Sequence, residues 1–366
     1  MNVLFLTNIP SPYRVEFFNE LGKHCNLTVL FERKSAKDRE QQWLLNSFNT
    51  FTAHFLSGVS IGNDSALSFE VLRFLKSEKY DIVVVGVYST PTGMLAIKYM
   101  RLNKIQFILN ADGGMIKNDS KWRYALKHFF ISSANAWLSS SDETSNYLEY
   151  YGASKNAIYK YPFTSIKDED IVNCPLSNNE KRKIRQELNI NEDRVILAVG
   201  RFISIKGFDT LIKSTSLIDS STGVYIIGGQ ATEEYSDLKQ SLNLNNVHFI
   251  EFQAKEELSK FYKMSDLFVL PTRGDVWGLV INEAMACGLP VITTDKCVAG
   301  LELIEDWENG FIVPVDDEKI LAEKISIALK DDKLLEKMAI NNLEKIKQYT
   351  IGNMAKVHMD IFEKLK

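Results

Sequence analysis

The chain has 366 residues, of which 45% are hydrophobic and 25% are charged, so it has enough apolar material for two folded cores. The formal net charge of −4 excludes a global basic field that would recruit nucleic acid. Four cysteines lie far apart in the sequence and no C-x-x-C pair occurs, so we expect free thiols and no structural zinc.

Short apolar runs alternate with segments of helical period over residues 1–165 of the chain. The helix expected at Val15–Leu21 ends before Gly22, and Ser140-x-x-Glu143 resembles a capping box. Residues 81–100 are interrupted by Ser89–Gly93, so we expect a strand, a turn and the start of a helix rather than a membrane span. The predicted strands are Val3–Leu6, Leu27–Phe31, Ile82–Val85, Phe107–Leu109 and Ala136–Leu138.

Residues 166–185 are polar and match neither period, so they are predicted to be a linker between domains 1–165 and 186–366. The alternation then resumes. The expected strands are Val195–Val199, Val224–Ile227, Val247–Phe249, Leu267–Leu270 and Val291–Thr293. The expected helices are Phe208–Leu217, Glu233–Leu242, Glu256–Tyr262, Leu279–Cys287, Asp317–Leu329, Lys333–Gln348 and Gly352–Leu365.

Continuous apolar strands alternating with helices predict an α/β protein with two doubly wound parallel sheets that face each other across a cleft. The C-terminal helices are expected to pack back on the domains. The last helix either stays on the second domain or crosses back to the first.

The segment Pro271–Thr294 is the most informative in the chain. An apolar strand is followed by a turn and by a helix that opens near Gly278, so the amides of Gly278, Leu279 and Val280 can bind an anion. Glu283 follows Leu279 by four residues and shares its helix face, while Asp275 precedes the helix.

The segment Gly200–Gly207 follows another predicted strand and carries two cations. Arg201 and Lys206 both suit a diphosphate, and their charge-assisted hydrogen bonds could change affinity by roughly 10²–10⁴. Each segment alone is a weak signal, because cations in such loops often lie on the surface. In this order and context, the two segments together predict a nucleotide-diphosphate site.

These motifs resemble the retaining nucleotide-sugar glycosyltransferases of family four, which have two Rossmann-like domains in the GT-B arrangement. The resemblance rests on GRFISIKG, IIGG, VHFIEF, KEELSKFYKMSDLFVLPT and DVWGLVINEAMACGLPVI. It is close in the C-terminal half and covers the N-terminal half mainly through strand and helix order. It implies that a UDP- or GDP-linked hexose-type sugar passes to a glycan or lipid-linked acceptor, in surface polysaccharide or glycoconjugate synthesis.

The resemblance also implies roles for single residues. Arg201 and Lys206 would hold the donor diphosphate, Glu283 the ribose, and Asp275 would approach the donor sugar. The family usually has Glu where this chain has Asp275, so the contact made by that shorter side chain is open. Retention would proceed without a covalent intermediate, and neither a metal nor a cofactor is expected.

The N-terminal half departs further from the family. Residues 10–14, PSPYR, replace a glycine-rich loop, and Asp112 stands near the position where a histidine is usual. Asp112 either faces the transferred sugar or caps a turn. Tyr13 and Arg14 are candidates for acceptor or phosphate contact, with a surface position as the alternative for Arg14.

Residues 117–130 combine basic and aromatic side chains. They favour either a helix docked on an anionic membrane or an ordinary amphipathic helix whose aromatics face inward. The cations are Lys117, Lys121, Arg123 and Lys127, and the aromatics are Trp122, Tyr124, Phe129 and Phe130. We therefore expect a cytoplasmic protein, either free or peripheral on the inner membrane face.

Two rival functions remain on the sequence alone. They are a sugar-nucleotide epimerase of similar architecture and a non-catalytic protein that binds nucleotide sugars. A dinucleotide oxidoreductase is disfavoured, because no G-x-G-x-x-G follows the first strand.

Overall fold

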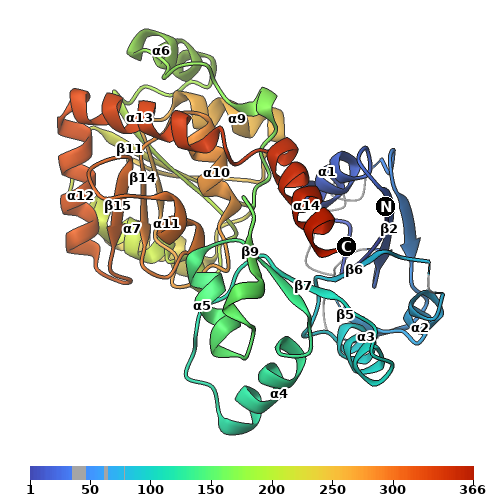
Figure 1. The fold of residues 1–366 in the computed structure, drawn as a ribbon. Helices are drawn as coiled ribbons and strands as arrows, with labels where there is room; N and C mark the ends of the chain where they lie inside the picture. The colour runs from blue at the N-terminus through green and yellow to red at the C-terminus, as the bar shows by residue number, and fades with distance from the viewer. Residues whose placement is uncertain (35–46, 62–64, 78) are drawn as a thin grey trace. The chain divides into compact units, whose positions relative to one another are not determined.

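The computed structural model describes residues 1–34, 47–61, 65–77 and 79–366. The chain divides into two compact units. The first comprises Met1–Ser165 together with Thr350–Lys366, and the second comprises Ile166–Tyr349. Each unit is built around its own parallel sheet with helices on both faces, so the expected α/β class with two Rossmann-like domains is confirmed (Figure 1).

The sheet of the first unit has the strand order β3-β2-β1-β6-β7-β8-β9, and every adjacent pair among these described strands is parallel. The strands are β1 (Asn2–Thr7), β2 (Asn26–Phe31), β3 (Thr52–Phe55), β6 (Ile82–Val85), β7 (Ile108–Ala111), β8 (Ala136–Ser139) and β9 (Ile158–Lys160). Strand β4 (Val59–Ile61) pairs antiparallel with β5 (Ser65–Leu67) outside this sheet.

Side chains of β1 alternate between the two faces of this sheet. Leu4 and Leu6 join a core with residues of α3, α4 and α5, while Phe5 packs against Phe18 of α1 with ring centroids 5.0 Å apart. Burial of both faces explains why the strands are almost continuously apolar. The helices are α1 (Pro12–Leu21), α2 (Val71–Leu75), α3 (Pro91–Leu102), α4 (Lys121–Ile131), α5 (Asp142–Tyr150) and α14 (Ile351–Leu365).

The sheet of the second unit has the order β12-β11-β10-β13-β14-β15, again parallel throughout the described strands. Its strands are β10 (Arg194–Val199), β11 (Thr222–Ile227), β12 (Val247–Ile250), β13 (Leu267–Leu270), β14 (Val291–Thr294) and β15 (Gly310–Val313). Its helices are α6 (Asn178–Glu187), α7 (Phe208–Thr215), α8 (Glu233–Ser241), α9 (Lys255–Met264), α10 (Leu279–Ala286), α11 (Val298–Leu303), α12 (Glu318–Lys330) and α13 (Asp332–Ile346).

The structure corrects two local sequence predictions. The segment 166–185 belongs to the second unit and contains most of α6, which packs on α9. Arg185 of α6 is buried and binds Asp266 at 2.7 Å, and this contact fixes the segment that polarity alone suggested was a linker. Helix α5 is capped by Ser141, whose side chain accepts from the Thr144 amide, rather than by the predicted Ser140–Glu143 box.

The last helix, α14, packs on α1 within the first unit, while α12 packs on α7 and α13 on α10 within the second (Figure 1). Its buried residues recur at helical spacing and include Met354, His358 and Phe362. The His358 ring lies 4.7 Å from that of Phe17 and 4.6 Å from that of Tyr161. A long-range apolar match therefore determines which unit receives the end of the chain.

His358 is 1% exposed, and its Nδ1 donates to the Met354 carbonyl at 2.8 Å. No partner for its Nε2 is found among the described residues. Burial lowers the pKa of His358 from 6.5 to about 4, and the positive charge of Arg14 acts in the same direction. The imidazole is consequently neutral in the folded protein at neutral pH.

We expect this buried imidazole to make folding sensitive to mild acid. Because the folded pKa is depressed, the unfolded chain binds the extra proton first, and stability is lost as the pH falls from 6.5 to about 4. The contribution is about 3 kcal/mol at the low end of that window. Urea unfolding at several pH values should therefore show a steeper loss for wild type than for His358→Phe. Parallel pH profiles for the two proteins would contradict this account.

Candidate functional site

The second unit places two loops side by side where its strand order reverses. Strands β11 and β12 lie on one side of β10, and β13 to β15 lie on the other, so the topological switch point falls between β10 and β13. The loop 200–207 leaves the carboxyl end of β10, and the loop 271–278 leaves that of β13. Ligands of doubly wound sheets bind at such points.

An ion pair joins these two loops. Lys206 Nζ lies 2.5 Å from Asp275 Oδ2, and the two side chains are only 19% and 15% exposed. The main chain of Asp275 is itself fixed, since its amide donates to the Lys296 carbonyl and its carbonyl accepts from Val298. The structure thus brings together two of the residues that the sequence predicted separately.

Two glycines allow the loops to approach this closely. Gly207 has φ of 67°, and a Cβ atom there would lie 2.0 Å from the Pro271 carbonyl oxygen. Gly278, the N-cap of α10, has φ of 104°, and its Cβ would meet Cys297 Sγ at 2.9 Å. Both positions therefore require the left-handed conformation and the missing side chain of glycine.

Helix α10 begins beside the ion pair. Leu279 and Val280 are its first two residues, and the first amides of a helix have no intrahelical acceptor. A Cβ built on Gly278 would lie 3.8 Å from Asp275 Oδ2, so the helix start and the carboxylate are close neighbours. This corner of the unit combines the Lys206 ammonium group, the Asp275 carboxylate and a helix N-terminus.

Glu283 and Arg201 lie farther from the ion pair along the same two segments. Glu283 is half-buried on α10, and its Oε2 accepts from the Tyr262 hydroxyl at 2.9 Å. Burial raises the pKa of Tyr262 well above its usual value, which keeps that hydroxyl a donor. Arg201 is exposed at the start of the loop that carries Lys206.

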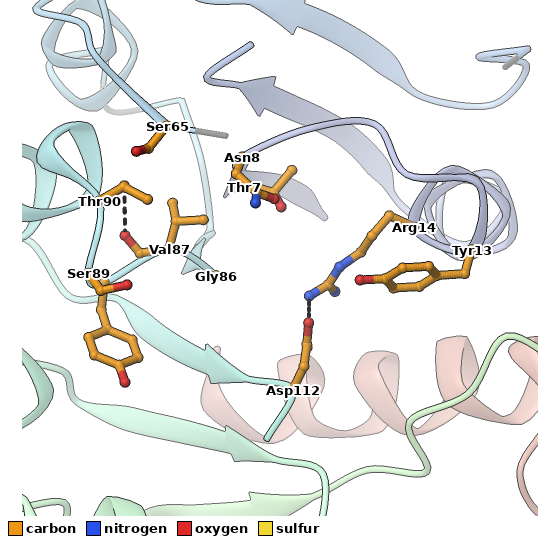
Figure 2. Close-up of a pocket in the computed structure, with 11 residues that line it drawn as sticks. Thr7, Asn8, Tyr13, Arg14, Ser65, Gly86, Val87, Ser89, Thr90 and Asp112 are labelled. Carbon is orange, nitrogen blue, oxygen red and sulfur yellow. Dashed lines mark hydrogen bonds and ion pairs between the residues drawn. The ribbon is translucent and has the colours of Figure 1, made fainter. Parts of the chain in front are cut away.

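The first unit has a pocket at its own switch point, between β1 and β6 (Figure 2). Its volume is about 430 Å³, and most of its lining residues carry polar side chains, chiefly hydroxyls. Most lining residues lie at or just after the carboxyl ends of β1, β6 and β7 or at the start of α1, and Ser65 comes from β5. They include Thr7, Asn8, Tyr13, Arg14, Gly86, Ser89, Thr90 and Asp112.

Asp112 is the centre of a polar network in this pocket. Its carboxylate pairs with the Arg14 guanidinium and accepts from Asn110 Nδ2 and from the Tyr161 hydroxyl, each at 2.7 Å. Burial raises the pKa of Tyr161, so the phenol stays protonated and donates. Asp112 therefore lines this pocket, and its role toward the transferred sugar stays a prediction.

Arg14 is only 5% exposed, so its alternative as a surface residue is wrong. Figure 2 shows its guanidinium directed at Asp112, with the Tyr13 ring beside it on α1. The guanidinium carbon lies 5.7 Å from the ring centroids of both Tyr13 and Phe163. These contacts hold one buried positive charge against one carboxylate at the pocket wall.

Sequence reasoning missed Tyr161, Asn110 and most of the hydroxyl-bearing lining. Tyr161 directly follows β9 and is 49 residues from Asp112 in the sequence. Only the fold brings its hydroxyl to the Asp112 carboxylate. A signal did exist for Thr7 and Gly86, since both stand at the carboxyl ends of predicted strands.

The described residues contain no group of three or more His, Cys, Asp or Glu side chains arranged to hold a metal ion. None of the helices in the described ranges combines the length and the apolar character needed to cross a bilayer.

Comparison with known proteins gives independent information on these features. The family model described as "Glycosyl transferases group 1" matches residues 180–345, most of the second unit. A Campylobacter jejuni N,N'-diacetylbacillosaminyl-diphospho-undecaprenol alpha-1,3-N-acetylgalactosaminyltransferase is 22% identical over 306 residues, which cover 81% of this chain and 80% of that protein. The Staphylococcus aureus capsular polysaccharide biosynthesis glycosyltransferase CapM is 31% identical over 53% of this chain and 52% of its own length.

Solved structures extend the likeness to the whole chain. Anabaena HepE, solved in complex with UDP, has a TM-score of 0.78 and 19% identity, and the match covers 100% of this chain and 99% of HepE. HepE has also been solved in complex with UDP-glucose, with a TM-score of 0.75. At this identity the match shows the fold of both units.

Proposed function

Because the chain is a glycosyltransferase with the GT-B fold, we propose that it moves a hexose-type sugar, with retention, from a UDP- or GDP-sugar to a lipid-linked or glycan acceptor. The second unit binds the donor and the first unit binds the acceptor. The observation that carries this proposal is the Lys206–Asp275 pair beside the start of α10, at the switch point of the unit that matches the group 1 family.

In this proposal the donor diphosphate lies against Lys206, Arg201 and the amides at the start of α10. Positive charge at that place stabilises the charge that develops on the leaving diphosphate. Lys206 is bound to Asp275 in this structure, so the donor must share the ammonium group with that carboxylate. Asp275 then faces the donor sugar, close to the bond between that sugar and the diphosphate.

Glu283 is proposed to bind the ribose hydroxyls. The Tyr262 hydroxyl occupies one carboxylate oxygen and fixes the orientation of the side chain. A ribose contact of this kind acts in the ground state and the transition state alike, so its loss raises KM more than it lowers kcat.

Asp112 is proposed to face the transferred sugar in place of the histidine usual in the family. Its carboxylate is held by Arg14, Asn110 and Tyr161, which leaves its orientation well defined. Tyr13 and Arg14 line the same pocket, whose hydroxyl-rich wall suits a polyhydroxyl acceptor. A lipid-linked acceptor is supported by the C. jejuni relative, whose name specifies a diphospho-undecaprenol substrate.

The first experiment tests the donor site directly. Titration with UDP, GDP and a panel of their sugars should identify one base, and Lys206→Ala should lower kcat/KM for that donor by about 10- to 150-fold. Lys330→Ala, an exposed cation on α12 of the same unit, is the matched control and should have no effect. Near-wild-type kcat/KM in Lys206→Ala would contradict the diphosphate assignment.

The same assay separates transfer from its rivals. An epimerase would convert the donor without any acceptor, and a binding protein would leave the donor intact under all conditions. We expect donor consumption to depend on added acceptor, with only slow hydrolysis in its absence.

Metal-independent transfer is also part of the proposal, since Lys206, Arg201 and the α10 amides supply the positive charge at the diphosphate. We therefore expect activity in EDTA to stay within about twofold of the untreated enzyme. Loss of activity that Mg²⁺ or Mn²⁺ restores would show that a cation carries this charge instead.

We further propose that the protein acts on the cytoplasmic side of the membrane and docks there peripherally through α4. Trp122, Leu126 and Phe129 recur at helical spacing on α4 and are 64%, 40% and 38% exposed. Leu102, at the end of the neighbouring α3, is 74% exposed, and Arg101 beside it stacks on Phe129 at 4.5 Å. The alternative was a helix whose aromatic side chains face inward. Phe130 is buried and fits that alternative, whereas Trp122 and Phe129 are exposed and do not.

The charges around this apolar face suit anionic lipid. Lys117, Lys121 and Arg123 are exposed, whereas Lys127 is half-buried and pairs with Asp119 at 2.7 Å. Three cations near an anionic surface contribute about 1 kcal/mol each, so attachment would be reversible and would weaken with salt.

Liposome sedimentation tests the docking face. Changing Lys117, Lys121 and Arg123 to Glu should reduce binding to anionic vesicles by about 100-fold or more, and Trp122→Ser should reduce it further. Changing Lys319, Lys330 and Lys333 to Glu alters the net charge equally on the second unit and should have little effect. Equal binding of both triple variants to anionic vesicles would contradict the proposal that α4 docks on the membrane.

A further inference from the structure

Arg273 lies two residues before Asp275 and has no role in the proposed chemistry, yet its side chain makes three hydrogen bonds. Its Nη2 donates to Asp209 Oδ2 at 2.6 Å and its Nε to Asp316 Oδ1 at 2.7 Å. Its Nη1 donates to the Ser204 carbonyl at 2.5 Å. A single guanidinium thus joins the loop after β13 to the turn that carries Lys206, to α7 and to the segment before α12.

The main chain of the same loop strengthens this connection. The Arg273 amide donates to the Ile205 carbonyl at 2.8 Å, and Thr272 Oγ1 donates to the same oxygen at 2.9 Å. Ser204 and Ile205 are the two residues directly before Lys206. The three contacts therefore fix the backbone from which the Lys206 side chain reaches Asp275.

Arg273 also neutralises two carboxylates near the proposed phosphate site. Asp209 is the second residue of α7, which begins directly after Gly207. Asp316 precedes α12 and has a left-handed φ of 60°. Asp209 Oδ1 is buried and has no hydrogen-bond partner among the described residues, while Asp209 Oδ2 accepts from Arg273 at 2.6 Å and lies 4.0 Å from Lys213 Nζ. Without the guanidinium, two negative charges would compete with Asp275 for the Lys206 ammonium group.

From this geometry we propose that Arg273, with Asp209 and Asp316, is a positioning residue for the donor site. It sets the distance between Lys206 and Asp275 and keeps Asp209 and Asp316 from competing with Asp275 for the Lys206 ammonium group. The role rests on the proposed function, because it acts through Lys206 and not by touching the substrate. Lysine could not replace it fully, since an ammonium group lacks the planar fork that reaches three acceptors.

The alternative is that Arg273 only stabilises the fold. The two roles differ in what a double-mutant cycle measures. If Arg273 acts through Lys206, its removal should have little further effect once Lys206 is gone, whereas a purely structural effect should be the same in both backgrounds.

The test compares wild type, Arg273→Ala, Arg273→Lys, Lys206→Ala and the double variant Arg273→Ala/Lys206→Ala. UDP and GDP are the probes for Kd, and kcat and KM are measured with the sugar donor that wild type turns over. We expect Arg273→Ala to weaken binding of the recognised nucleotide about tenfold in wild type and less than twofold in Lys206→Ala. Arg273→Lys should recover part of the loss.

Arg194→Ala is the matched control. Arg194 lies in the same unit as Arg273, and the side chains of both are 26% exposed. Arg194 is the first residue of β10, at the end of that strand opposite the site, and it pairs with Asp332 of α13. It should change thermal stability but not nucleotide Kd. An equal loss of affinity on removing Arg273 in both backgrounds, or wild-type Kd in Arg273→Ala, would overturn the positioning role.

Failure of wild type to bind either nucleotide would overturn the proposed function, and the positioning role with it. If wild type binds and transfers the donor normally but the effects of Arg273→Ala and Lys206→Ala on Kd are simply additive, the positioning role alone would be overturned.

Discussion

The Lys206–Asp275 ion pair is the contact on which the candidate donor site depends. It joins loops that leave neighbouring strands at the switch point, where the helices covering the sheet leave room for side chains to meet. The first unit repeats this solution with different residues, since Arg14 from α1 pairs with Asp112 after β7. In both units an opposite charge on a nearby segment orients the carboxylate that the proposed chemistry uses.

The ion pair needs a closely fitted backbone around it. Gly207 and Gly278 permit the approach of the loops, and Arg273 ties the turn before Lys206 to the loop before Asp275. Lysine has a flexible four-carbon stem, so the position of its ammonium group is only as definite as the backbone and the partner that hold it. In the proposed site a donor would meet a cation already oriented, which would reduce the ordering cost of binding.

The two units divide the remaining tasks. The second unit carries the features shared with the group 1 glycosyltransferases, while the first presents the polar pocket and the exposed apolar face of α4. The end of the chain belongs to the first unit, because α14 packs its apolar side on α1. His358 lies in that packing and contacts Tyr161, which also binds Asp112, so the chain terminus supports the pocket residues directly.

Local pattern alone determined most helices, the two parallel sheets and the strands β1, β2, β6, β7, β8 and β10 to β14, since burial on both faces leaves a continuous apolar signature. It did not show β3, β4, β5, β9 or β15. The motif spacing also placed Lys206 and Asp275 in loops at strand ends. Only tertiary structure decided that Lys206 binds Asp275, that Arg14 is buried, that Tyr161 completes the Asp112 network and that 178–187 is helical. These outcomes depend on partners 69, 98, 49 and 81 residues away, as in the contacts of Lys206, Arg14, Tyr161 and Arg185. No local period records such distant pairings, because they arise only when the sheet brings its strand ends together.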